Sequence, residues 1–151
     1  MTKRIFTVGI ITSIAMAMIE MIYEGLFGVG FWSAPVFIAA VLLRNLQAVA
    51  LPVPFGVVPV VVGLMGHMMN SIIFTFVFMV FIAKRFTSRA TAITGGIVYA
   101  LMIFFIMWFL VLPAIDPVML NLNPYVFAFA HIVWGTVLGL MARIAVTSKS
   151  A

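Results

Sequence analysis

Five polar side chains lie within long apolar stretches of this sequence and could carry chemistry there. Glu20, His67 and His131 are deeply placed, Glu24 follows Glu20 by four residues, and Asn70 follows His67 by three. An ionisable group inside a membrane costs about 2.5 to 3.5 kcal/mol on insertion scales, so it usually faces the interior of a helix bundle and finds a partner. We therefore treat these five residues as one candidate polar cluster that binds a proton, an ion or a small ligand.

Several kinds of chemistry are open to such a cluster. A carboxylate with imidazoles can pass protons or bind a solute. His67 and His131 could ligate a b-type haem, or could bind a metal together with Glu20. Met65, Met68 and Met69 surround His67 and would suit copper(I), although methionine is also a common filler of apolar cores. Alternatively, Glu20 forms a hydrogen bond to a histidine and has only a structural role in the bundle. The sequence does not identify a cofactor.

The composition shows what solvent surrounds these residues. Apolar residues make up 66% of the 151 and charged residues only 7%, whereas a soluble domain has about 25% charged residues. The net charge is +5, and the basic residues lie in small groups between apolar stretches. A nucleic-acid-binding protein would instead gather them into a basic stripe. The absence of cysteine excludes thiolate metal sites and disulfides. We expect a protein whose surface contacts the lipid bilayer and that does not bind nucleic acid.

Four apolar stretches are long enough to cross a hydrocarbon core, which takes about 20 helical residues. The fold predicted for residues 1–151 is a single all-α transmembrane domain, a four-helix bundle with spans near 5–27, 57–83, 91–112 and 125–146. Residues 34–51 are apolar at first but then carry Arg44 and other polar residues. We interpret them as a short interfacial or re-entrant helix between the first two spans.

The distribution of basic residues supports this topology. With four spans, seven of the eight lysines and arginines fall on one side of the membrane and only Arg44 falls on the other. The positive-inside rule then places both termini in the cytoplasm, and we expect a bacterial cytoplasmic (inner) membrane. A fifth span at residues 34–51 would weaken this charge asymmetry.

The same placement brings the polar residues to similar depths. At about 1.5 Å per residue, Glu20 and His131 lie roughly 10 Å inside the outer boundary and His67 lies roughly 15 Å inside it. Small residues accompany them and let helices approach closely. We expect Glu20, His67 and His131 to meet in the outer half of one bundle, with helix packing at three glycines: Gly63, Gly135 and Gly139.

Three functions compete on this evidence. The short loops and the lack of a nucleotide or catalytic motif favour a non-catalytic subunit of a larger membrane complex, with other subunits as partners. A transporter or channel for a proton, ion or small solute could use the polar cluster, and four helices would then need a homo-oligomer to enclose a path. A haem or metal protein is the third possibility. Whether the chain is an enzyme stays open.

Overall fold

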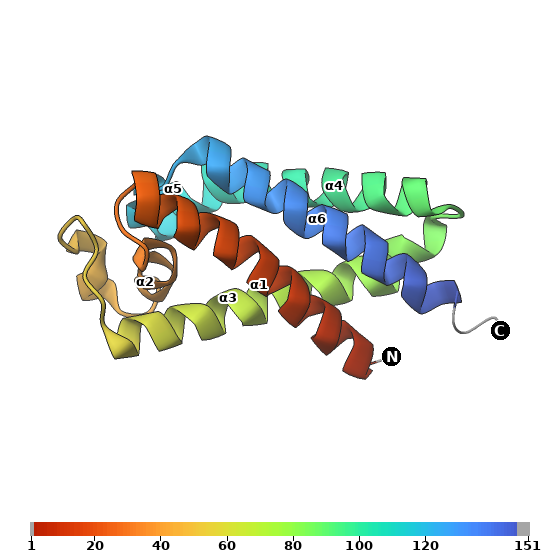
Figure 1. Ribbon diagram of the computed structural model, residues 1–151, viewed down its shortest axis with the longest axis horizontal. Helices are drawn as coiled ribbons and strands as arrows, with labels where there is room; N and C mark the ends of the chain where they lie inside the picture. Colours follow the sequence, from red (N-terminus) through yellow and green to blue (C-terminus); the bar gives the residue numbers. More distant parts are fainter. Residues whose placement is uncertain (1, 148–151) are drawn as a thin grey trace.

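The computed structural model describes residues 2–147, with the side chains described up to residue 142. Four of its helices are long and apolar enough to span a membrane: Thr2–Phe27, Val57–Arg85, Arg89–Ile115 and Pro124–Ala142. The four predicted spanning helices are thus confirmed, and they indicate an integral membrane protein. Figure 1 shows these helices along the long axis of the molecule, with both termini at the same end.

Two of the spans are composite helices. The second consists of α3 (Val57–Val77), a π-helical turn η2 (Phe78–Ile82) and a short 3-10 turn η3 (Ala83–Arg85). The third consists of α4 (Arg89–Ile106), a π-helical turn η4 (Met107–Val111) and α5 (Leu112–Ile115). π-helical turns inside α-helices are rare and occur frequently at functional sites. The turn η4 lies beside the cavity described below.

The first and last spans are regular helices. They are α1 (Thr2–Phe27) and α6 (Pro124–Thr147). Helix α4 begins at a capping box, in which the Ser88 hydroxyl accepts from the Thr91 amide at 3.1 Å and the Thr91 hydroxyl accepts from the Ser88 amide at 3.2 Å. These bonds satisfy backbone donors that a helix start otherwise leaves free.

Residues between the first two spans form two short helices. Helix α2 (Ser33–Ala39) has seven residues and packs against α3, and it is followed by the 3-10 turn η1 (Arg44–Ala48). A further 3-10 turn, η5 (Pro117–Asn121), connects α5 to α6. All three lie at the end of the bundle opposite the start of α1, and we call this end the α2 end (Figure 1).

Glycines set the closest helix contacts. Helix α4 packs along α6, where a Cβ at Gly96 or at Gly135 would collide with the backbone of the other residue, and a Cβ at Gly139 would collide with the carbonyl of Ala92. Gly63 of α3 meets the Pro35 carbonyl of α2 in the same way. Gly63, Gly135 and Gly139, which the sequence singled out, therefore lie at helix contacts.

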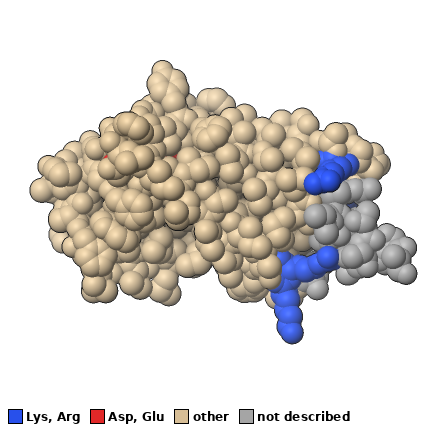
Figure 2. All heavy atoms as spheres, viewed as in Figure 1, with Lys and Arg blue, Asp and Glu red and all other residues tan. Residues whose placement is uncertain are grey.

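Charge divides the two ends of the molecule. On the face drawn in Figure 2, lysine and arginine side chains gather at the end where α1 begins, and the rest of the described face shows almost no charged side chains. The basic residues Lys3, Arg4, Lys84, Arg85 and Arg89 belong to the elements of this end. This asymmetry is the structural counterpart of the charge pattern in the sequence.

Candidate functional site

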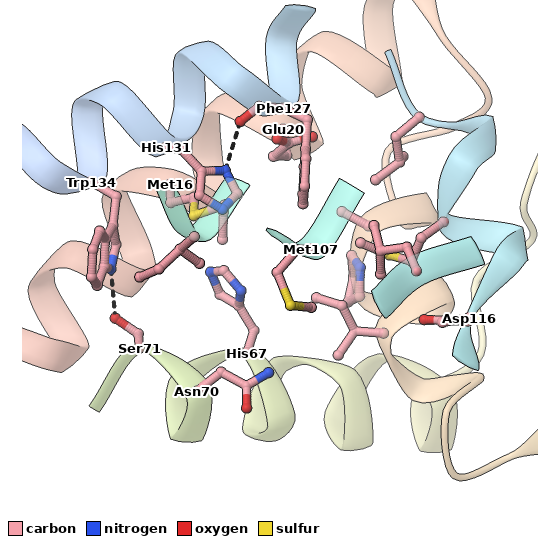
Figure 3. A pocket seen from close by; sticks show the side chains of 18 of the residues that line it. Met16, Glu20, His67, Asn70, Ser71, Met107, Asp116, Phe127, His131 and Trp134 are labelled. Atoms are coloured by element: carbon pink, nitrogen blue, oxygen red, sulfur yellow. Dashed lines mark hydrogen bonds between the residues drawn. The ribbon is translucent and has the colours of Figure 1, made fainter. Parts of the chain in front are cut away.

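A cavity of about 140 Å³ lies among the helices toward the α2 end. The cavity is lined by residues of α1, α2, α3 and α6 and of the turns η4 and η5. Helix α4 contributes one lining residue, Ile103. Glu20, His67, Asn70 and His131 are among the lining residues, so four of the five candidate polar residues share one cavity. Figure 3 shows that Glu20, His67 and His131 surround this space from three different helices.

Glu20 is the most unusual of these residues. It lies on the buried stripe of α1 that also contains Ser13 and Met16, because residues three and four apart share a helix face. The side chain is only 3% exposed, yet neither carboxyl oxygen has a hydrogen-bond partner within the described part of the chain. A buried polar group without a partner is costly, so this carboxyl is the strongest candidate in the described chain for contacting a ligand.

His67 connects α3 to α1. Its Nε2 lies 3.1 Å from the carbonyl oxygen of Ser13, and a carbonyl can only accept, so Nε2 is the donor. In the neutral ring Nδ1 is then a hydrogen-bond acceptor.

His131 is held within α6. Its Nδ1 donates to the Phe127 carbonyl at 2.8 Å, which leaves Nε2 as the acceptor in the neutral ring. The imidazole lies edge-on to two aromatic rings, with centroid distances of 4.7 Å to Phe127 and 5.7 Å to Phe104. Backbone bonding and aromatic packing fix the orientation of this ring.

Hydrogen bonds close the cavity on the side away from the α2 end. The Trp134 indole donates to the Ser71 hydroxyl at 2.8 Å, and that hydroxyl donates to the Gly9 carbonyl at 2.8 Å. The Thr12 hydroxyl lies 3.1 Å from the same Ser71 oxygen. We call Thr12, Ser71 and Trp134 the floor of the cavity, and it joins α1, α3 and α6.

Polar contacts also fix the α2 end above the cavity. The Gln47 amide donates to the Asp116 carboxylate and its oxygen accepts from the Val118 amide at 3.2 Å, while Arg44 donates to the Ile115 carbonyl at 2.7 Å. Burial raises the pKa of Asp116 above its ordinary value, and the Gln47 hydrogen bond and the Arg44 charge oppose that rise. These contacts tie η1 to the segment that leads into α6.

Glu24 lies outside the cavity lining, although the sequence grouped it with the candidate cluster. Its carboxylate accepts from the backbone amides of Val29 at 3.0 Å and Asn123 at 3.1 Å. A Cβ at Gly28 would collide with this carboxylate, so glycine is required there for the side chain to fold over the end of α1. Glu24 therefore fixes the two loops at this end and does not face the cavity.

The cavity is not fully enclosed by buried side chains. Most of its lining is buried, and the exposed lining residues are Val41, which follows α2, and Asn70 of α3. Met107 of η4 is partly exposed and lines the cavity from the opposite helix. We call Val41, Asn70 and Met107 the mouth of the cavity.

The ligands and the volume of the cavity bear on the metal and haem hypotheses. Among the described residues, no group of three or more histidine, cysteine, aspartate or glutamate side chains is placed to hold a metal. Met65 and Met69 are exposed on the outer face of α3, whereas the methionines that line the cavity are Met16 and Met107. The cavity volume is below the roughly 300 Å³ at which pockets for drug-sized ligands begin. The geometry therefore favours a ligand smaller than haem.

Sequence reasoning missed several lining residues. Met16 and Trp134 could have been identified from helical spacing, since Met16 lies one turn from Glu20 and Trp134 one turn from His131 on the same helix faces. Met107 and the α2 residues Ala34 and Pro35 gave no such signal, because their positions depend on how separate helices pack. Comparison with models of protein families, with curated proteins and with solved structures gives no match to this chain.

Proposed function

We propose that this chain binds a small solute in the Glu20 cavity within the membrane and acts as a binding or transport protein for it. The observation that carries the proposal is the buried carboxyl of Glu20, which has no partner among the described residues but shares a cavity with two oriented histidines. A purely structural glutamate would be expected to bond one of those histidines. Both histidines instead bond backbone carbonyls.

The closed floor and the mouth support binding of a solute that enters through the mouth. A solute in the cavity would be separated from the end where α1 begins by the hydrogen-bonded floor. Transport through the chain would require those bonds to open, and a homo-oligomer is one way to support such a path. On the charge asymmetry we place both termini in the cytoplasm and the α2 end outside, with α2 as a short interfacial or re-entrant helix.

A survey of solute classes tests the proposal. Thermal unfolding of the purified protein in detergent is measured with ammonium salts, carboxylate salts and small neutral alcohols or amides. Since a ligand stabilises the state that binds it, at least one class should raise the Tm of the wild type but not of Glu20→Gln. The proposal fails if no class acts, or if every class acts equally on both proteins.

A second candidate function is a non-catalytic subunit of a membrane complex. Helix α3 is much less buried than α1 or α6, and it exposes the amide of Asn70 near the middle of its length. In a membrane such an amide gains from a hydrogen bond to another helix. Mild extraction followed by mass determination would reveal a bound partner, whereas a monomer of 16.6 kDa would count against this candidate.

A further inference from the structure

Glu20, His67 and His131 can accept hydrogen bonds from a ligand in the cavity. Glu20 has two carboxyl oxygens without partners in the described chain, and both can only accept once the group is a carboxylate. His67 and His131 each use one ring nitrogen as a donor to a backbone carbonyl, so the other nitrogen of each neutral ring is an acceptor. Side chains from α1, α3 and α6 thus present acceptors, and a complementary ligand needs several N–H or O–H donors.

Charge narrows the class of ligand further. The titratable groups that line the cavity are Glu20, His67, His131 and Asp116, and Glu24 lies one turn along α1. Neither lysine nor arginine is among the described lining residues. Asp116 is engaged by Gln47, and Glu24 by backbone amides. Glu20 is therefore the carboxyl that a cation would neutralise.

Size and shape favour a small organic cation over a bare metal ion. A cavity of about 150 Å³ accommodates a molecule the size of benzene, so about 140 Å³ leaves room for several heavy atoms. The aromatic rings of Phe127 and Trp134 line the space, and such rings attract cations. From these features we infer that the cavity binds a small ammonium cation, of the size of methylammonium or ethylammonium. This inference rests on the proposed function and names its ligand class.

When the cation binds, Glu20 releases a proton. In the empty cavity the neutral carboxyl of Glu20 is the less costly form, because an isolated carboxylate is poorly tolerated in apolar surroundings. When the ammonium ion enters, the O–H bond of Glu20 breaks and the proton passes to water. The resulting carboxylate accepts a hydrogen bond from an N–H group of the cation. The filled site holds one negative and one positive charge, so the net charge buried in the membrane stays zero.

Isothermal titration of the purified, detergent-solubilised protein with methylammonium chloride tests the inference. Titrations in two buffers of different ionisation enthalpy count the protons released, and about one per cation bound is expected. Methanol, acetate and silver ions are the comparison ligands, and each should bind more weakly than methylammonium. Glu20→Gln should weaken methylammonium binding by at least about 30-fold, because a buried charge pair loses one partner.

Two further variants keep the result interpretable. Glu20→Asp retains the charge and should preserve proton release at reduced affinity. Met18→Leu changes an exposed residue of the same helix and should bind as the wild type does. Unaltered helicity and Tm of the unliganded variants would show that they fold.

Each outcome has a distinct meaning. Equal affinity for methanol or acetate, retained affinity in Glu20→Gln, or tight silver binding without methylammonium binding would overturn the ammonium inference. If another solute class still stabilised the wild type through Glu20, the proposed function would survive that result. If no class did so, both would fall.

Discussion

The indole N–H of Trp134 donates to the hydroxyl of Ser71 at 2.8 Å and so joins α6 to α3 beneath the cavity. Both side chains are buried, Trp134 being 4% and Ser71 5% exposed. Ser71 also bonds the backbone of α1 at Gly9, so a single hydroxyl connects three helices. The floor of the cavity thus depends on one small side chain.

Ser71→Ala should destabilise the protein by about 1–3 kcal/mol, because it leaves the buried indole N–H without an acceptor. Equilibrium unfolding in mixed detergent, followed by circular dichroism, measures the change. Thr136→Ala is the matched control, since the Thr136 hydroxyl donates to the Ile132 carbonyl of its own helix. Equal effects of the two substitutions would contradict the role assigned to Ser71.

Replacing Gly135 with a residue that has a side chain should push α4 away from α6. A Cβ there would collide with the Gly96 carbonyl, so even Gly135→Ala should lower stability by about 1–3 kcal/mol. Gly66→Ala is the control, because a Cβ at Gly66 would lie 3.4 Å from the Cγ2 methyl of Ile38, which is an ordinary van der Waals contact. Folded yield and Tm of the two variants provide the comparison, and a Gly135→Ala variant as stable as Gly66→Ala would rule out this tight contact.

Asp116 should make stability depend on pH. Its pKa is raised in the folded protein, so the folded state holds the proton more tightly than the unfolded state, and stability falls as the pH rises from the ordinary pKa through the folded pKa. Asp116→Asn removes this titration. The free energy of unfolding of the wild type, relative to that of Asp116→Asn, should therefore decrease from acid toward neutral pH, and a difference that does not vary with pH would contradict the assignment.

Cysteine labelling tests the proposed topology, because the chain has no cysteine of its own. Ala48 in η1 and Ala90 in α4 are both exposed and lie at opposite ends of the bundle, whereas Ser33 is 0% exposed and would be a poor probe. In intact cells Ala48→Cys should react with an impermeant thiol reagent, and Ala90→Cys should react only after permeabilisation. The reverse pattern would place the termini outside.

The sequence predicted the four long helices because uninterrupted apolar runs of this length leave few alternatives in a bilayer. Helical periodicity also identified the faces that carry Glu20, His67 and His131. It grouped Glu24 with them because the stripe continues, but the chain turns at Gly28 and directs that carboxylate to loop amides. The contribution of α2 and the η4 turn to the cavity depends on packing between distant segments, which periodicity does not encode.

The proposed function requires that a solute can reach Glu20, and labelling of Ala17→Cys measures this access. Ala17 lines the cavity one turn before Glu20, while Ala100 is 0% exposed and does not line it. A small methanethiosulfonate should therefore modify Ala17→Cys in the folded protein, as detected by intact mass, and leave Ala100→Cys unmodified. Adding Asn70→Trp at the mouth should slow the reaction of Ala17→Cys, whereas Met65→Trp on the exposed face of the same helix should not. An Ala17→Cys that reacts no faster than Ala100→Cys would contradict an accessible cavity beside Glu20.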